Sequence, residues 1–295
     1  MKVENINKSH LDRVLKGDIV DHLYHFGISS SDEILNSVKD LKAIVLGGSS
    51  HRIKRMAEHW SANNKNTPLL KFPKDERFTV YYTNGVLFSS HGMGMPSMSI
   101  AIQELMKLVY FVKKGNLSEI EKVFWCRVGT SGGIGIAPGS VVISTEAVLP
   151  DLKPYRLFVT GEEYYFDPKF PEKCIDEIIK ASAMEKINIV KGKTIGGDSF
   201  YIEQNRIDGA IAMCDEKAKI DWLKKAASFG VKNIEMETPM MAGLLNHWGF
   251  PRFSAICCTL LDRLHGDQVS STKEELEHYS LNAEKVLWNY LKTFV

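Results

Sequence analysis

Three segments of this sequence are predicted to form loops that are rich in glycine or carry an arginine, and each follows a run of strand character. The loops span residues 47–52, 91–94 and 127–133. The apolar run 41–46 precedes the first loop, and residues 51–60 after it space their apolar side chains like a helix. Strand, tight loop and helix in this order are typical of an α/β protein.

The rest of the chain continues this alternation. The runs 77–83 and 86–90 flank Asn84-Gly85, which predicts a hairpin. Pro96 stands near the start of a long amphipathic pattern that closes before Gly115. The other predicted elements are strands at 123–128, 140–143, 187–190, 233–236 and 253–261, helices at 174–183 and 221–229, and a last helix opened by a capping box of Ser271 and Glu274. They predict one α/β domain over residues 1–295, with a mixed central sheet flanked by helices.

Composition excludes several classes of function. The 37 basic and 36 acidic residues nearly cancel, which argues against a nucleic-acid partner but not against a small anion. Five cysteines without CxxC spacing indicate reduced thiols and a cytoplasmic location, and the nine histidines show no metal-ligand spacing. The polar first residues and the lack of an apolar run of about 18 residues predict neither a signal peptide nor a membrane span.

Arg127 stands inside the apolar run 123–128 and leads directly into the third loop. A buried guanidinium costs several kcal/mol unless a partner neutralises it. A structural carboxylate and a bound phosphate are both possible partners, and the residues alone leave this choice open.

Two further clusters have the chemistry of a binding site. Gln204 and Arg206 are two residues apart, so on an extended segment they would project the same way and could read a flat imide-like base. Glu235 and Glu237 stand at the end of the predicted strand 233–236. A buried glutamate could bind the vicinal hydroxyls of a ribose, or it could cap a helix or form an internal ion pair.

Taken together, six segments resemble the nucleoside phosphorylase-I family, and within it the branch that acts on uridine. In chain order they are GGSSHR, SHGMG-PS-SI, RVGTSGGIG, DSFY-x-x-Q-x-R, NIEMET and TLLDRLHGDQ. The likeness spans roughly residues 25–270. It implies a single domain around a twisted mixed sheet and the reversible cleavage of uridine by phosphate to uracil and ribose 1-phosphate. It also implies at least a homodimer with shared active sites, and no metal or organic cofactor.

The resemblance assigns roles to individual residues. The phosphate-binding residues it implies are Gly48, Arg52, Arg127, Thr130 and Arg77, the last lent by a neighbouring subunit. The ribose-binding residues are His25, also from the neighbour, with Met236 and Glu237. The base-binding residues are Phe200, Gln204, Arg206, Arg263 and Gly132. Arg52, Arg127 and Arg206 are expected to be catalytic, because they stabilise developing negative charge.

Asp262 departs from the family pattern. The uridine branch carries asparagine here, whereas purine-specific relatives use an aspartate to protonate the base. A purine or broad-specificity phosphorylase therefore stays open as an alternative, as does a catalytically silent nucleoside-binding paralogue. A salt bridge from Asp262 to Arg263 or Arg206 would be the structural explanation of the same residue.

Overall fold

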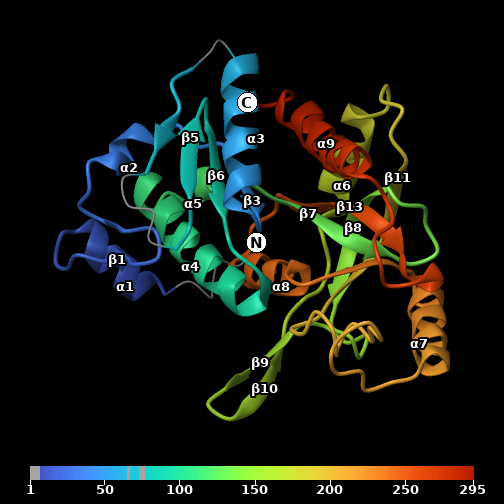
Figure 1. Cartoon of the computed structure of the whole chain (residues 1–295). Helices are drawn as coiled ribbons and strands as arrows, with labels where there is room; N and C mark the ends of the chain where they lie inside the picture. Colours follow the sequence, from blue (N-terminus) through green and yellow to red (C-terminus); the bar gives the residue numbers. More distant parts are fainter. Residues whose placement is uncertain (1–6, 65–66, 73–76) are drawn as a thin grey trace. The chain divides into compact units, whose positions relative to one another are not determined.

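The computed structural model describes residues 7–64, 67–72 and 77–295 (Figure 1). Asp75 and Glu76, which precede Arg77 in its motif, lie outside the described residues. The chain divides into two compact units, and each is described by itself. The first consists of Met1–Cys126, His247–Phe253 and Phe294–Val295, and the second of Arg127–Asn246 and Ser254–Thr293. The single boundary of 1–295 stays a prediction.

The first unit contains a mixed four-stranded sheet in the order β3-β6-β5-β4. Its strands are β3 (Ala43–Gly47), β4 (Leu70–Lys71), β5 (Val80–Thr83) and β6 (Val86–Ser90). All residues of β3 and β6 are buried, and the two strands run parallel. The predicted hairpin is confirmed, because β5 and β6 pair antiparallel around Asn84 and Gly85, both at positive φ.

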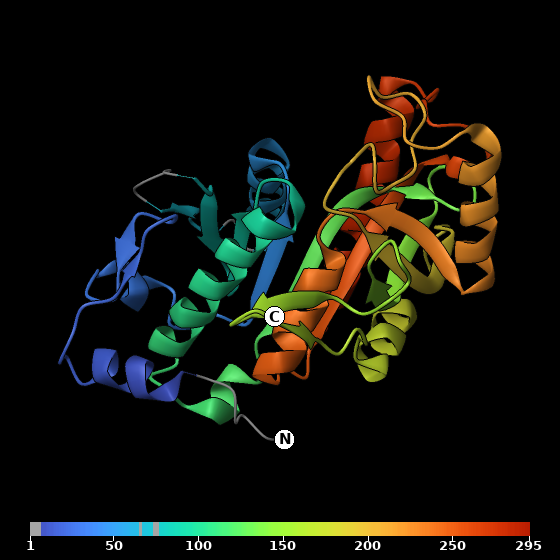
Figure 2. The same cartoon turned by 90° about the horizontal axis from the view of Figure 1, so that it is seen from below.

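Helices cover this sheet on both faces. Figure 1 shows α3 (Ser50–Asn63) on one face and α4 (Gly94–Val112) on the other. In Figure 2, α1 (Lys8–Leu15) lies alongside α4, and Tyr110 donates a 2.6 Å hydrogen bond to Asp12 there. The smaller elements of the unit are β1 (His22–Leu23), β2 (Ile28–Ser29), α2 (Ile34–Ser37) and α5 (Leu117–Ile120).

The second unit is built on a mixed sheet of five strands in the order β12-β11-β8-β13-β7. These strands are β7 (Phe124–Gly133), β8 (Val141–Val148), β11 (Ile189–Gly196), β12 (Val231–Glu235) and β13 (Phe253–Asp262). Because β12 also pairs with β7, the row of strands closes on itself. The helices are α6 (Glu172–Ala181), α7 (Glu216–Ser228), α8 (Thr238–Trp248), the 3-10 helix η1 (Arg263–His265) and α9 (Lys273–Leu291). The predicted α/β class with a mixed sheet and flanking helices is confirmed.

One local prediction for this unit is wrong, and one element was not predicted. The capping box of α9 is formed by Thr272 and Glu275, one residue after the predicted pair. Ser271 and Thr272 each have a glutamate three residues later, so both registers satisfy the motif. The hairpin of β9 (Arg156–Val159) and β10 (Glu162–Tyr165) was not predicted. It extends away from the sheet of its unit (Figure 1).

Candidate functional site

The loop after β3 has the expected form of an anion site. Ser49 caps α3 by accepting a hydrogen bond from the Arg52 backbone N–H at 3.4 Å, so Arg52 lies in the first helical turn. A Cβ atom on Gly48 would approach the Gly92 carbonyl oxygen to 3.0 Å. Two of the three loops therefore meet beyond the carboxyl ends of the parallel strands β3 and β6. Backbone N–H groups at such a helix N-terminus favour an anion.

His25 and Arg77, the two residues expected to serve a neighbouring subunit, lie together. The backbone N–H of Arg77 donates to the His25 carbonyl oxygen at 3.3 Å. His25 Nδ1 lies 2.6 Å from a carboxylate oxygen of Glu104, which is buried, and the Arg77 side chain is exposed. Glu104 fixes the orientation of the His25 ring, a role that the sequence pattern did not suggest.

The partner of Arg127 is a pair of carboxylates. Its Nη2 atom lies 2.8 Å from Glu235 Oε2 and also pairs with Glu237 Oε2, while Nη1 donates to Cys257 Sγ at 2.9 Å. All three charged side chains are at most 6% exposed. Burial alone lowers the pKa of Arg127, but the two glutamates, with Cys257, outweigh burial and raise it. Of the two partners that the sequence left open, the structure contains the carboxylate.

Glu235 and Glu237 both face Arg127. Strand β12 ends at Glu235 and the chain turns at once into α8, so the turn, and not strand alternation, positions Glu237. Glu235 accepts backbone N–H bonds from Glu237 and from Thr238, the latter at 2.9 Å. It therefore caps α8 and pairs with Arg127 at the same time. Burial raises the pKa of Glu235 to about 7, against the opposing effect of Arg127.

This pKa predicts how stability depends on pH. In the folded chain Glu235 holds a proton up to about pH 7, whereas an unfolded glutamate loses it near 4.5. The group therefore stabilises the fold below pH 4.5, and this contribution is lost as the pH rises through 7, with a slope of at most about 1.4 kcal/mol per pH unit. We expect Glu235→Gln to flatten the decline in unfolding free energy between pH 5 and 8, measured by urea denaturation. Glu58→Gln, at an exposed helical position, is the matched control, and an unchanged slope in Glu235→Gln would contradict the assignment.

The third glycine-rich segment is strand rather than turn. β7 continues through Gly133, because Gly132 and Gly133 pair antiparallel with Ile234 and Asn233 of β12. The glycines here allow close approach. A Cβ on Gly129 would come within 2.2 Å of Arg127 Nη1, and one on Gly132 within 2.9 Å of Arg263 Cγ. The two glycines thus make room for the two arginines.

Gln204 and Arg263 form the centre of the predicted base site and are 4% and 1% exposed. Arg263 Nη2 donates to the Gln204 carbonyl oxygen at 2.8 Å, and Nη1 contacts Gln204 Oε1 at 3.4 Å. Arg263 Nε donates to Asp267 Oδ1 at 2.8 Å. The structure therefore brings together two of the predicted base-binding residues and adds Asp267 to them.

Arg206 joins the same group through Asp267, whose carbonyl oxygen accepts from Arg206 Nη2 at 2.9 Å. Its Nε and Nη2 also bind Asp208 at 2.9 and 2.6 Å. The guanidinium carbon of Arg206 lies 4.5 Å from the ring centre of Phe200, which is 44% exposed. Among the described residues Arg206 Nη1 and Gln204 Nε2 have no protein partner, so both can donate to a ligand.

The prediction that Gln204 and Arg206 lie on an extended segment is wrong. Residues 201–205 form turns rather than an extended segment. Asn205 has a φ of 50°, and the Arg206 N–H returns to the Tyr201 carbonyl oxygen at 2.9 Å. The two side chains are grouped by their tertiary partners and not by strand alternation.

Asp262 pairs with neither Arg263 nor Arg206. Its Oδ1 accepts from the backbone N–H groups of Gly135 at 2.9 Å and Leu264 at 3.1 Å, and its Oδ2 lies 3.0 Å from His265 Nδ1. It therefore caps η1 at the end of β13. The expectation of a salt bridge to one of the two arginines is wrong, because Asp267 and Asp208 bind them instead.

The remaining site residues are half-buried and adjacent to these groups in sequence. Thr130 lies in β7, and Met236 lies between Glu235 and Glu237. Among the predicted residues, the first unit carries His25, Gly48, Arg52 and Arg77, and the second carries Arg127, Thr130, Gly132, Phe200, Gln204, Arg206, Met236, Glu237 and Arg263. Sequence reasoning missed Glu104, Asp208 and Asp267.

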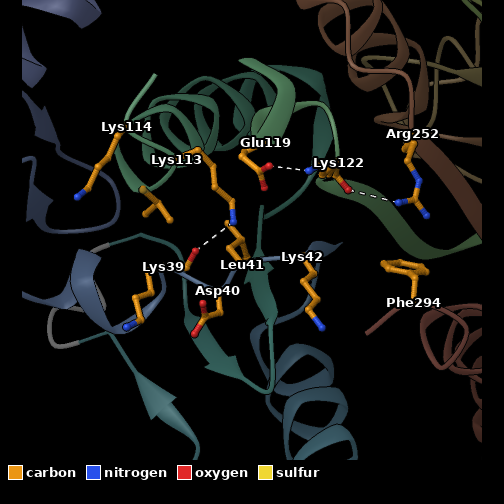
Figure 3. Close-up of a pocket in the computed structure, with 11 residues that line it drawn as sticks. Lys39, Asp40, Leu41, Lys42, Lys113, Lys114, Glu119, Lys122, Arg252 and Phe294 are labelled. Atoms are coloured by element: carbon orange, nitrogen blue, oxygen red, sulfur yellow. Dashed lines mark hydrogen bonds and ion pairs between the residues drawn. The ribbon is translucent and has the colours of Figure 1, made fainter. Parts of the chain in front are cut away.

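A cavity of about 610 Å³ in the first unit contains none of the predicted site residues. It is rich in basic residues, but in Figure 3 the ammonium groups of Lys39, Lys42 and Lys114 lie apart from one another, and Lys42 points away from the other two. Lys42 Nζ donates to the Val295 carbonyl oxygen at 2.7 Å, and Lys113 Nζ to that of Lys39 at 3.1 Å. The ammonium groups of Lys42 and Lys113 thus bind carbonyl oxygens of the protein and do not converge on a ligand.

Within residues 7–64, 67–72 and 77–295, every helix is too short or too polar to span a membrane. No group of three or more histidine, cysteine, aspartate or glutamate side chains there could hold a metal ion.

Comparison with known proteins gives the family. Residues 42–292 match the profile of the phosphorylase superfamily. The chain is 34% identical over 280 residues to uridine phosphorylase 1 of Mus musculus, covering 92% of this chain and 88% of that protein. It is 34% identical over 275 residues to the uridine and thymidine phosphorylase of Caenorhabditis elegans, covering 92% and 90%.

A solved structure agrees with these relatives. The crystal structure of uridine phosphorylase from Schistosoma mansoni in complex with uracil is similar with a TM-score of 0.88, at 29% identity and with 98% of each chain covered. The resemblance drawn from the six motifs and the expected nucleoside phosphorylase-like fold are confirmed. The chain belongs to the phosphorylase superfamily.

Proposed function

We propose that this chain catalyses the reversible phosphorolysis of uridine to uracil and ribose 1-phosphate. The observation that carries the proposal is the buried group of Gln204, Arg206 and Arg263, tied together through Asp267. Gln204 Nε2 and Arg206 Nη1 are donors directed to no protein atom among the described residues. Two such donors complement the carbonyl oxygens of a flat imide base such as uracil. The names of the relatives point to the same base.

The same donors account for the chemistry at the base. When the bond between C1′ and the base breaks, its electron pair stays on uracil and charge develops on the carbonyl oxygens. Guanidinium groups already in place stabilise that charge without reorganisation. Arg206 is therefore proposed to act on the transition state and not only to bind the substrate.

The sugar and the phosphate use the other groups. Glu237 is proposed to accept hydrogen bonds from the ribose hydroxyls, with Met236 beside it and Arg127 holding the carboxylate in place. The phosphate contacts inferred from the motifs, Gly48, Arg52, Arg77, Arg127 and Thr130, stay predictions. Holding phosphate and ribose in one orientation makes the reaction between them effectively unimolecular and so lowers its barrier. We therefore propose that the reaction uses no metal or organic cofactor.

The contacts of Asp262 favour a pyrimidine over a purine. A general acid for a purine base must present a free carboxyl oxygen, whereas Asp262 binds two backbone N–H groups and His265. Asp262 thus has a structural role in the present proposal. Activity on inosine or adenosine equal to that on uridine would reverse this conclusion.

The direct test is uracil release from uridine with and without inorganic phosphate. We expect release to require phosphate and to produce ribose 1-phosphate in equal amount. Equally fast release in buffer without phosphate would make the protein a nucleoside hydrolase. Release of no base from any nucleoside would favour a silent binding protein.

We also propose that the active enzyme is a homodimer that acts in the cytoplasm in pyrimidine salvage. Two features support the dimer: the adjacent placement of His25 and Arg77, and the apolar side chains on the β9–β10 hairpin, where Phe158 is 70% exposed. Five free cysteines, four of them buried, support a reducing compartment.

The shared site predicts complementation between inactive variants. Arg77→Ala and Glu237→Gln are each expected to be inactive, but a dimer containing one copy of each has one intact site. Random reassembly after mixing and refolding should restore about a quarter of wild-type activity. The matched control mixes Glu237→Gln with Arg206→Ala, whose residues come from the same subunit, and should restore none. Recovery in the control, or none in the test mixture, would contradict the shared site.

A further inference from the structure

Lys219 is a buried lysine on the core-facing side of α7. Leu223 and Ala226, at helical spacing from it, pack into the apolar core of the second unit. The Lys219 side chain is only 4% exposed, and its Nζ lies 2.8 Å from Asp267 Oδ2. Burying an unpaired ammonium group at an apolar position costs several kcal/mol. The ion pair with Asp267 therefore offsets the cost of burying Lys219.

Asp267 connects this lysine to the base site. Its Oδ1 accepts from Arg263 Nε at 2.8 Å, its Oδ2 also accepts from the Ile207 backbone N–H at 3.1 Å, and its carbonyl oxygen accepts from Arg206. Burial alone raises the pKa of Asp267, but the hydrogen bond from Lys219 and the other donors lower it below its ordinary value. Asp267 is therefore a carboxylate bound to two cations.

The charges of this group do not cancel. Its cations are Arg206, Arg263 and Lys219, and its anions are Asp208 and Asp267. Three positive and two negative charges leave one positive charge on a group that is mostly buried. Without Lys219 the same group would be neutral.

We propose that Lys219 is a charge-setting residue for the base site: by neutralising Asp267 it leaves Arg206 and Arg263 with a surplus positive charge for the departing base. The inference rests on the proposed phosphorolysis of uridine. In that reaction the C1′–N1 bond breaks, its electron pair leaves with uracil as an anion, and a phosphate oxygen forms the new bond to C1′. Lys219 acts through Asp267 and is a positioning residue, not a catalytic one.

The surplus charge has a signature that simple loss of packing lacks. A base that is already a good leaving group needs less stabilisation of its anion. The rate of phosphorolysis of its nucleoside should therefore fall less when the positive charge is removed. 5-Fluorouracil is more acidic than uracil because fluorine withdraws electrons, and 5-fluorouridine is therefore the comparison substrate. Partial unfolding would lower the rates with both nucleosides by one common factor.

The experiment compares Lys219→Met with the wild type on both nucleosides at saturating phosphate. We expect kcat/KM for uridine to fall about tenfold and that for 5-fluorouridine to fall less than about threefold, because electrostatic stabilisation is lost from the transition state. The KM for phosphate should stay within about twofold of the wild type, since the phosphate makes no contact with this group in the proposal. Lys217→Met is the matched control, because Lys217 lies on the same helix at 88% exposure and should leave all values unchanged.

A further variant covers a failure to fold. Lys219→Gln keeps a hydrogen-bond donor but removes the charge, and it should show the same unequal loss. Equal losses on the two nucleosides in either variant, or no loss at all, would overturn the proposal.

Binding measurements separate this inference from the proposed function. Calorimetry with 5-fluorouracil at pH 6, where the base is neutral, and at pH 9, where it is ionised, gives the preference for the anion without turnover. We expect the wild type to prefer the anion and Lys219→Met to lose that preference. A wild type that binds in this way but releases no uracil from uridine disproves the proposed function alone, whereas equal preference in both proteins disproves the role of Lys219.

Discussion

Replacing Arg127 by methionine is expected to abolish phosphorolysis and to lower the free energy of unfolding by about 3–5 kcal/mol. Arg127 is the cation that faces both Glu235 and Glu237, and all three side chains are buried. Without it, two carboxyl groups are left close together in a medium of low dielectric constant with no cation to neutralise them. Urea denaturation at pH 7.5 and a coupled assay for ribose 1-phosphate measure the two effects.

The matched control is Arg156→Met. Arg156 also pairs with two acids, Asp151 and Glu163, but its side chain is 30% exposed, so we expect a loss below about 1 kcal/mol. Adding Glu235→Gln to Arg127→Met should recover part of the stability, because it removes a buried acid that must either stay charged without a cation or take up a proton. If Arg127→Met loses no more unfolding free energy than Arg156→Met, the contacts of Arg127 with Glu235 and Glu237 do not stabilise the fold.

Replacing Arg206 by alanine is expected to lower kcat/KM for uridine by about 10²-fold or more, as happens when a donor to a developing anion is removed. The loss should appear in kcat and in the KM for uridine, and the KM for phosphate should be nearly unchanged. Stability should change little, because Arg206 binds Asp208 at the edge of the buried group and not at its centre.

Steady-state kinetics with uridine and phosphate varied in turn provides this measurement. Asp208→Asn, which keeps Arg206 but removes its charged partner, is the companion variant. It should lower kcat/KM much less than Arg206→Ala does. A loss below threefold in Arg206→Ala would end the proposed role of Arg206 at the base.

Some features of the site were predictable because they depend on neighbouring residues alone. The loop Gly47 to Arg52 between a buried strand and a helix follows from local spacing, and Ser49 caps α3 within this loop. Asn84-Gly85 sets the hairpin through its positive φ angles. An arginine in an apolar strand required a buried partner, and Arg127 has two.

Other features could not be predicted from local patterns. The position of Glu237 depends on a turn, because the strand ends at Glu235 and a helix begins at Thr238. The pairing of β7 with β12 keeps Gly132 and Gly133 extended, although glycine favours turns. The predicted helix 221–229 did not include Lys219, and only its distance from Asp267 connects it with Arg206 and Arg263.

The sequence by itself determined the family and the α/β class and contains the side chains proposed to carry the chemistry, because motifs and short-range conformational preferences are local properties. The tertiary structure decided which charges meet. It gives Arg127 two carboxylates, assigns Asp262 to a helix cap, and joins Lys219 through Asp267 to the arginines of the base site. The physical reason is that electrostatic energy depends on distance and burial, and for residues far apart along the chain both are set by the packing of strands and helices.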